Sequence, residues 1–279
     1  GVVSNDEVGR LGEAVNEMAV GLKERELIKA AHQKVAQELA VAWRIQESFL
    51  PGNPPRLPGW QLTATLEPAK QTSGDFYDFI PLPDGRLGLL VADVTDKGVG
   101  AALYMALSRT LLRTYAVEHE TRPELAFRAA HQRILADTDT SQFVTVFYGI
   151  LDPATGTLTY SNAGHNPPYL VSAQNGAAIQ ELENTGPPLG LRMFKDITWE
   201  QGVARIAPGD ALVLYTDGIT EAQDAQEELF EEERLMGVVR ANLGRSAQAI
   251  QHALVTGVHE FVGGAPQADD LTLMVLVRG

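Results

Sequence analysis

The feature that most constrains this chain is a proline-rich run, Pro51-Gly52-Asn53-Pro54-Pro55, which follows fifty residues without a proline. Proline lacks a backbone N–H donor and biases the residue before it away from the helical region, so the run ends any preceding helix. We therefore expect a domain boundary here. Residues 1–55 form a helical arm, and residues 56–279 must build their own core.

The arm has the apolar spacing of a coiled coil. Steps of three and four residues separate the members of a first stripe, Val8, Leu11, Val15, Met18 and Leu22. A second stripe follows, at Ile28, Ala31, Val35, Ala42, Ile45 and Phe49. The phase slips near residues 23–27, which would distort a supercoil locally. An amphipathic helix lying on its own domain is the alternative, but this pattern is long for packing on one small core.

Strand-like and helix-like runs come in blocks after the boundary. The strand-like runs are Gln61–Leu66, Leu87–Val94, Phe143–Leu151, Thr157–Ser161, Ala211–Thr216 and Leu271–Val277. The helix-like runs form two adjacent pairs, Val99–Val117 with Pro123–Ala136 and Glu227–Asn242 with Ala247–Val262. Because strict β-α-β alternation is absent, the pattern favours an α+β fold with largely antiparallel sheets.

Composition limits the chemistry and the partners. The chain has no cysteine, so disulfides, thiolate metal sites and cysteine nucleophiles are excluded. Its 22 Lys and Arg against 36 Asp and Glu leave a net charge of −14, which disfavours nucleic acid. No apolar run approaches the roughly 20 residues of a membrane-spanning helix. The start at Gly1, without Met, suggests a fragment of a longer protein.

Acidic residues stand at the ends of several apolar, strand-like runs. Asp93 follows Leu89-Leu90-Val91-Ala92, Asp217 follows a similar run, and Asp75 and the Asp269-Asp270 pair adjoin others. Each alone is ordinary turn chemistry. Together, converging carboxylates would repel one another unless a cation held them, and oxygen ligands favour Mg²⁺ or Mn²⁺. Two such ions bridged by a carboxylate and a water suit in-line attack of that water on a phosphate ester.

Six stretches in order resemble the metal-dependent protein serine/threonine phosphatases of PPM type, specifically the bacterial SpoIIE/RsbU branch. They are Ser73–Asp78, Val91–Leu103, Ala163–Pro168, Thr185–Gly190, Tyr215–Ala222 and Asp269–Thr272. The resemblance implies an αββα sandwich, two antiparallel sheets flanked by helix pairs, preceded here by the long coiled-coil helix. It also implies two Mn²⁺ or Mg²⁺ ions per subunit between the sheets.

Carried over by position, the resemblance implies a role for each ligand. Asp93 would bridge the two ions, and the Val94 carbonyl and Asp75 would bind one of them. Asp217 would bind the other ion. Catalysis would proceed through Asp93, Asp75 and Asp217, by attack of the water that bridges the ions.

Two assignments remain open in the sequence. Asp269 would join Asp217 at the second ion, but Asp270 is its neighbour and a possible replacement. The general acid is also unassigned, because Thr95 stands where eukaryotic relatives carry a histidine. His165 lies in a Gly-His-Asn-Pro-Pro turn, and we expect it to be structural, with its imidazole bonded to the backbone.

The arm has resemblances of its own. Residues 5–18 resemble the second helix of a HAMP linker, and residues 44–51 resemble the helix-to-domain junction of this phosphatase branch. We therefore expect a HAMP-like helix fragment at 1–22, a coiled-coil signalling linker at 23–55 and the phosphatase domain at 56–279. Pairing through residues 6–50 would make a homodimer. The intact protein would be a membrane-anchored bacterial receptor with this cytoplasmic part, tethered only through a missing N-terminal portion.

The expected function is hydrolysis of phosphoserine or phosphothreonine on a partner protein, regulated through the helical arm. The branch implies a STAS-domain anti-anti-sigma-type substrate in a partner-switching pathway. One alternative is a weak or inactive signalling scaffold, but a scaffold should have lost a ligand. Another is a small-molecule phosphatase, which should prefer p-nitrophenyl phosphate to a phosphoprotein.

Overall fold

The computed structural model describes residues 7–70, 72–194 and 196–279. Residues 1–6 of the expected HAMP-like segment lie outside it, as do the side chains of Val8 and Ala31 in the expected stripes. The helices are α1 (Glu7–Glu47), α2 (Val99–Glu118), α3 (Pro123–Asp137), α4 (Asp217–Thr220), α5 (Glu231–Asn242) and α6 (Ala247–Val262), with short 3₁₀ turns at Pro83–Gly85 and Arg192–Phe194.

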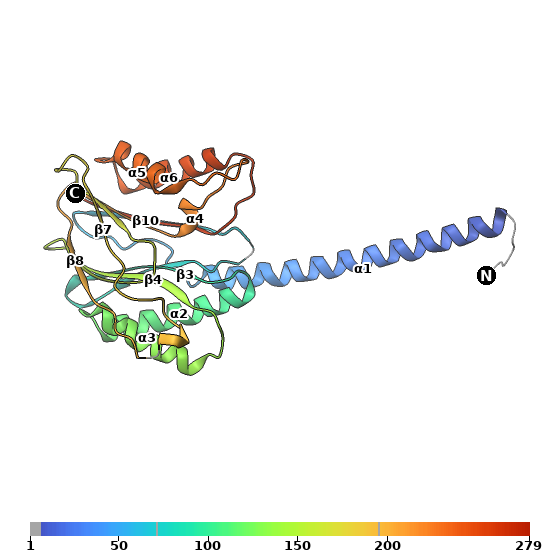
Figure 1. Cartoon of the computed structure of the whole chain (residues 1–279), viewed down its shortest axis with the longest axis horizontal. Helices are drawn as coiled ribbons and strands as arrows, with labels where there is room; N and C mark the ends of the chain where they lie inside the picture. Colours follow the sequence, from blue (N-terminus) through green and yellow to red (C-terminus); the bar gives the residue numbers. More distant parts are fainter. Residues whose placement is uncertain (1–6, 71, 195) are drawn as a thin grey trace.

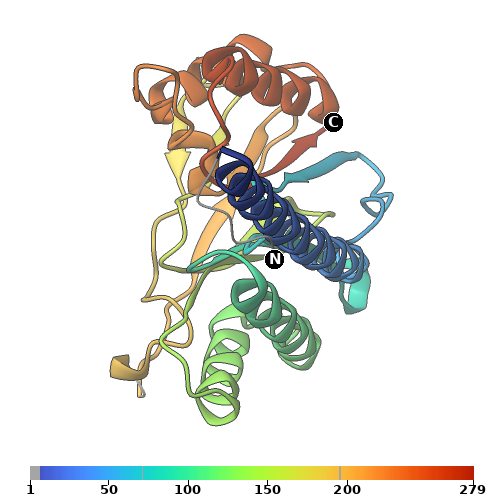
Figure 2. The same ribbon diagram turned by 90° about the vertical axis from the view of Figure 1, so that its right-hand side faces the viewer.

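Two antiparallel sheets stack face to face between two helical layers (Figure 1). The first sheet has the order β1-β10-β9-β6-β7, from β1 (Trp60–Glu67), β10 (Leu271–Arg278), β9 (Ala211–Tyr215), β6 (Tyr169–Val171) and β7 (Ile179–Glu181). The second has the order β2-β3-β4-β5-β8, from β2 (Phe76–Pro81), β3 (Leu87–Val94), β4 (Val144–Asp152), β5 (Thr157–Ala163) and β8 (Gly202–Arg205). Helices α5 and α6 cover the first sheet, and α2 and α3 cover the second, so the αββα expectation is confirmed (Figure 2).

Continuous apolar runs arise because the central strands are buried on both faces. In β3, Leu89 and Val91 pack against the other sheet, whereas Leu90 and Ala92 pack against α2 and α3. Neighbouring side chains point to opposite faces of a strand, so a strand between two layers needs apolar residues at every position. The same alternation decides whether a polar residue at the end of a strand points between the two sheets or toward the helices.

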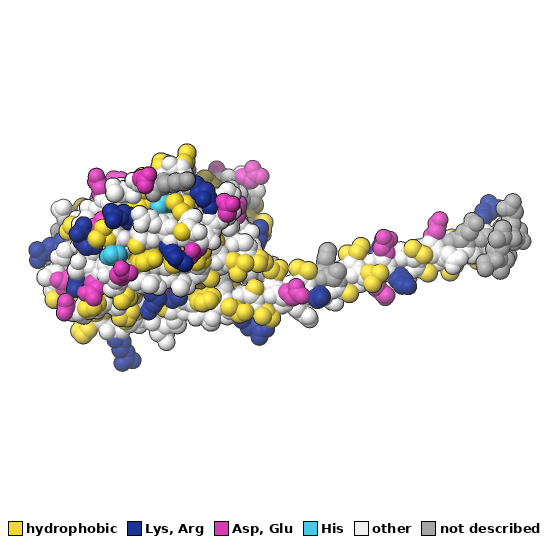
Figure 3. All heavy atoms as spheres, turned by 90° about the horizontal axis from the view of Figure 1, so that it is seen from below, with side chains coloured by type: hydrophobic (Ala, Val, Ile, Leu, Met, Phe, Trp, Pro, Cys, Tyr) yellow, Lys and Arg dark blue, Asp and Glu magenta, His cyan; other side chains and the backbone are white. Residues whose placement is uncertain are grey.

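Helix α1 is continuous through the expected phase slip and extends away from the domain (Figure 1). Its apolar stripe is exposed, as at Leu11 (65 %) and Met18 (64 %), and Figure 3 shows apolar side chains along the arm. The alternative of a helix lying on its own domain is therefore wrong. Within the described residues, no helix has the length and apolarity to cross a membrane.

Some sequence expectations were wrong in detail. Helix α5 begins at Glu231 rather than Glu227, because Asp224 accepts backbone N–H bonds from Gln226 and Glu228 and closes a turn there. Glu227 itself has a φ of 65°. The short strands β2, β6, β7 and β8 were not expected as strands, since runs of three to six residues carry little periodicity.

Candidate metal centre

The expected site residues leave the same end of both sheets. Asp75 immediately precedes β2, and Asp93 lies near the end of β3, with which β2 pairs antiparallel. Asp217 follows β9, and Asp269 and Asp270 precede β10, which pairs antiparallel with β9. An antiparallel pair places the end of one strand beside the start of the next. The topology therefore brings the five carboxylates together.

Asp75 ties the two sheets together. Its Oδ2 accepts hydrogen bonds from the hydroxyls of Thr216 (2.7 Å) and Thr272 (2.6 Å), both on the opposite sheet. The residue is only 2 % exposed. Burial, followed by the charges of Asp93 and Asp270, raises the pKa of Asp75 well above its usual range, against the lowering effect of the two hydroxyls.

Burial and neighbouring carboxylates also perturb Asp93 and Asp217, although Lys97 and the Gly218 N–H partly offset the effect at Asp217. Burial, and then the nearby charge of Asp217, raises the pKa of Asp93 to about 7. The pKa of Asp217 is also raised, first by burial and then by Asp269 and Glu221. Perturbation by burial plus like charges indicates a site that a cation would complete.

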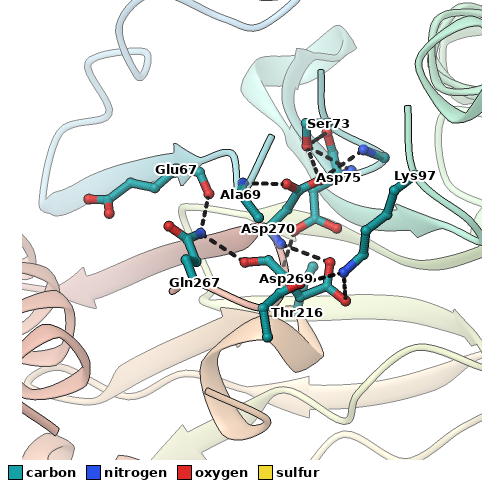
Figure 4. A network of polar contacts seen from close by, with 11 residues as sticks. Glu67, Ala69, Ser73, Asp75, Lys97, Thr216, Gln267, Asp269 and Asp270 are labelled. Atoms are coloured by element: carbon teal, nitrogen blue, oxygen red, sulfur yellow. Dashed lines mark hydrogen bonds and ion pairs between the residues drawn. The ribbon is translucent and has the colours of Figure 1, made fainter. Parts of the chain in front are cut away.

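The adjacent aspartates have different partners (Figure 4). Asp270 is saturated: one oxygen accepts the Ala69 N–H (2.7 Å), and the other accepts the Gly74 N–H (2.9 Å) and the Ser73 hydroxyl (2.7 Å). Asp269 is more exposed and pairs with the Lys97 ammonium at 2.9 Å. Asp270 therefore fixes the loop before β2. The carboxylate of Asp269 is instead paired with Lys97, a partner that a metal ion could replace.

Glycines allow the backbone to close in on this cluster. A Cβ at Gly74 would lie 2.7 Å from the Val94 carbonyl oxygen and 3.6 Å from Asp93 Oδ1, and one at Gly218 would lie 1.9 Å from the Asp270 carbonyl oxygen. Contacts under 3.0 Å do not occur for real side chains, so both positions require glycine. The absence of a side chain at Gly74 thus lets the loop before β2 lie directly against the Val94 carbonyl oxygen.

The donor set fits a hard divalent cation, because every group is an oxygen and the carboxylates outnumber the positive charges. Among the described residues, however, no three His, Asp or Glu side chains are close enough together to hold one ion as they stand. Hydrogen bonds to Thr216 and Thr272 and the ion pair with Lys97 draw carboxylate oxygens toward other partners. Binding an ion would require some of these side chains to turn.

The profile of the Stage II sporulation protein E (SpoIIE) family matches residues 83–279. The chain belongs to the SpoIIE family. The match contains Asp93, Asp217 and Asp269, whereas Asp75 lies before it. Among curated relatives, IcfG of Synechocystis sp. is 32 % identical over 301 residues, covering 98 % of this chain and 46 % of IcfG. The phosphoserine phosphatase RsbU of Bacillus subtilis is 27 % identical over 256 residues, covering 92 % of this chain and 74 % of RsbU.

A solved structure shows the same fold as this SpoIIE-family chain. The SiaA-PP2C domain of Pseudomonas aeruginosa superposes with a TM-score of 0.78 at 22 % identity, over 90 % of this chain and 99 % of that one. The fold is therefore that of a PP2C domain. Since the chain spans about half the length of IcfG, the fold and family apply to this segment and not to a whole protein.

Neither Thr95 nor His165 is placed as a solvent-exposed proton donor in this SpoIIE-family chain, and the buried Nε2 of His165 has no hydrogen-bond partner among the described residues. The Thr95 hydroxyl donates to the Phe143 carbonyl and accepts from the Phe143 N–H (3.1 Å). His165 is buried, and its Nδ1 bonds to the Thr145 hydroxyl at 2.9 Å. Burial lowers the pKa of His165 to about 4, so the imidazole is neutral. The general acid stays unassigned.

Sequence reasoning missed the partners of the carboxylates. Thr216 and Thr272 lie inside quoted motifs but received no role, and the same holds for Lys97 and Ser73. For the two threonines the sequence did contain a signal, the alternation of side chains along a strand. Thr216 and Thr272 alternate with apolar residues that face the helices and therefore point between the sheets. Gln46 was also missed, because the apolar stripe of α1 continues through Ile45 and Phe49 beside it and gives no signal that the glutamine is buried.

Proposed function

We propose that this chain is a Mn²⁺- or Mg²⁺-dependent protein serine/threonine phosphatase that acts on phosphoserine or phosphothreonine of a partner protein. The resemblance to metal-dependent phosphatases of PPM type supports the metal ions, and this chain has the PP2C fold. One observation carries the proposal: buried carboxylates from both sheets meet at one end of the sandwich with little positive charge to balance them. Such an arrangement is costly unless it serves to bind cations.

The residues would divide the work as follows. Asp93 would contact both ions, Asp75 and the Val94 carbonyl would bind one, and Asp217 would bind the other. Two divalent ions supply a water of lowered pKa and stabilise charge on the phosphoryl oxygens when bound. Thr216 and Thr272 orient Asp75 through its Oδ2.

Asp269 is the better candidate than Asp270 for the remaining ligand. Asp270 already accepts three hydrogen bonds that define the loop from residue 69 to residue 74. Drawing it onto an ion would break these bonds and leave buried donors without partners, which costs about 1–3 kcal/mol each. Asp269 Oδ1 accepts the Asp270 N–H (2.8 Å), but its Oδ2 would only exchange one cationic partner, Lys97, for another.

The decisive experiment measures phosphate release from a phosphoprotein with and without Mn²⁺, for the wild type and Asp93→Asn. We expect release that depends on Mn²⁺ in the wild type and is lost in the variant. Equal rates in metal-free protein, or full activity in Asp93→Asn, would overturn the two-ion mechanism. The exposed Asp84 provides a matched control, because Asp84→Asn also removes one carboxylate but lies outside the cluster.

The family resemblance supports a proposal for the substrate class. The SpoIIE/RsbU resemblance supports a phosphorylated STAS-domain protein as substrate, within a partner-switching pathway. Competition between such a phosphoprotein and p-nitrophenyl phosphate tests this proposal. A preference for the small ester would identify a small-molecule phosphatase instead.

The arm is proposed to regulate the domain by forming a homodimer through residues 6–50. Its exposed apolar stripe supports pairing, and residues 1–22, 23–55 and 56–279 remain the proposed HAMP-like fragment, linker and phosphatase domain. A membrane-anchored receptor with a cytoplasmic output domain is the proposed context. Sedimentation of Met18→Glu tests the dimer, with the off-stripe Asn16→Glu as control. We expect only Met18→Glu to shift the chain toward monomer.

A further inference from the structure

Gln46, in the last turn of α1, is buried although most of that helix is exposed. Its side chain is 4 % exposed, whereas the neighbouring Ile45 is 56 % exposed. A buried primary amide needs hydrogen-bond partners, since leaving one unsatisfied costs free energy. Gln46 finds its partners in the loop before β2, not on its own helix.

The amide of Gln46 binds both sides of one peptide unit. Its Nε2 donates to the Ser73 carbonyl (2.5 Å), and its Oε1 accepts from the Ser73 N–H (3.0 Å). This pairing satisfies the donor and the acceptor of Ser73 at once, as a neighbouring strand would. The backbone of Ser73 is thereby held at a set distance from the axis of α1.

Ser73 passes this restraint to the carboxylate cluster. Its hydroxyl donates to Asp270 (2.7 Å) and accepts from the Asp75 N–H (3.0 Å), as Figure 4 shows for the residues around it. The next residue, Gly74, donates to the same Asp270 oxygen and lies against the Val94 carbonyl. Gly74 directly follows the peptide unit that Gln46 binds, and it sets how closely the loop approaches the Val94 carbonyl. Asp75 is the next residue along the chain.

We propose that Gln46 is a positioning residue: it clamps the loop of residues 73–75 so that Asp75 and the Val94 carbonyl keep the spacing an ion needs. The part about the ion rests on the proposed function, whereas the clamp itself does not. A slide of α1 by one residue moves it about 1.5 Å along its axis, enough to break both bonds to Ser73. The axial position of the arm would then set the geometry of the site.

Three variants of the full chain test the clamp. Gln46→Met keeps the length of the side chain but removes both hydrogen bonds. Gln46→Glu keeps an acceptor for the Ser73 N–H and loses the donor to its carbonyl. Gln33→Met makes the same change at an exposed glutamine of α1 and serves as the control.

The first measurement is amide hydrogen exchange without metal. We expect exchange in residues 73–75 to be about tenfold faster in Gln46→Met, intermediate in Gln46→Glu and unchanged in Gln33→Met, with the rest of the domain unaffected. The second is Mn²⁺ binding by calorimetry. Loss of a residue that orients ligands weakens metal binding by roughly tenfold or more, and we expect the same order of variants.

A merely structural role for Gln46 would give a different result: faster exchange throughout the domain and an unchanged Mn²⁺ affinity. Wild-type exchange in residues 73–75 of Gln46→Met would overturn the clamp. If Gln46→Met does not fold, Gln46→Glu decides by the same two measurements. Absence of phosphatase activity in the wild type would overturn the proposed function alone, because the exchange result does not depend on catalysis.

Discussion

Asp75 and Asp78 lie three residues apart, and both are buried, at 2 % and 1 % exposure, yet their surroundings are opposite. Asp78 faces α2, where Arg109 (2.9 Å) and Arg113 (2.7 Å) neutralise it. Asp75 faces the opposite sheet, where hydroxyls and other carboxylates surround it, and no Lys or Arg in the described part of the chain pairs with it. An odd separation along a strand sends the two side chains to opposite faces.

The difference separates a structural carboxylate from a ligand candidate. Burial raises the pKa of Asp78 too, but Arg113 and Arg109 counter it. At Asp75, burial and like charges act in the same direction, and only the two threonines oppose them. A protein retains an uncompensated buried charge where that charge has a use, so Asp75 and not Asp78 belongs to the proposed metal site.

The largest expected effect is from Asp75→Asn. We expect phosphate release to fall roughly a hundredfold or more, because one ligand of an ion is lost. The metal-free protein should be at least as stable as the wild type, because like-charge repulsion falls while both threonine bonds remain possible. Wild-type protein at about 100 times Kd of Mn²⁺ should gain about 2.7 kcal/mol in unfolding free energy. Denaturation with and without Mn²⁺ measures this gain, and its persistence in Asp75→Asn would remove Asp75 from the site.

Asp78→Asn should lower the stability of the metal-free protein and leave its response to Mn²⁺ unchanged, the opposite of Asp75→Asn. Removing one member of a buried ion pair leaves the other uncompensated, and we expect a loss of about 3 kcal/mol because Arg113 is partly exposed. The gain in stability on adding Mn²⁺ should stay as in the wild type. Urea denaturation provides both numbers. A stable Asp78→Asn that no longer responds to Mn²⁺ would contradict the comparison.

His165 represents a third way to bury a titratable group, which is to keep it neutral. Its pKa of about 4 in the folded chain is below the value of about 6.5 in an unfolded chain, so the unfolded state binds more protons between these values. Its contribution to stability is complete above pH 6.5 and falls by up to roughly 1.4 kcal/mol per pH unit on acidification toward pH 4. His165→Gln should lose this slope, whereas exposed His252→Gln should keep it. An equal pH dependence of stability in the wild type, His165→Gln and His252→Gln would show that the buried neutral imidazole is not that of His165.

The smallest effect is expected from Lys97→Met. The Lys97 ammonium competes with an incoming cation for Asp269, so its removal should tighten Mn²⁺ binding about threefold, in keeping with the modest strength of a partly exposed ion pair. Calorimetry measures the change, with the exposed Lys70→Met as control. Weaker Mn²⁺ binding in Lys97→Met would show that Lys97 supports the metal site rather than competing with the ion.

Much of the fold was predictable because its signals are local. The proline run ends α1, the stripe of α1 has a helical period, and helices α2, α3 and α6 lie within two residues of their predicted bounds. Most candidate ligands were predictable in the same way, since Asp93 and Asp217 follow expected strands and the Asp269-Asp270 pair precedes one, whereas β2, which Asp75 precedes, was not expected. The start of α5 was not, because the side chain of Asp224 replaced a helical turn with a loop.

The sequence by itself determined which carboxylates end strands, that no thiol can take part, and that a long helix precedes the domain. Only the tertiary structure decided that Asp75 is uncompensated while Asp78 is paired, that Asp270 is saturated while Asp269 is exchangeable, and that Gln46 reaches Ser73. The reason is distance along the chain: Asp75 and Thr272 are 197 residues apart, and Gln46 and Ser73 are 27 apart. Periodicity reports the face on which a side chain lies, but its charge balance depends on what the rest of the fold brings to that face.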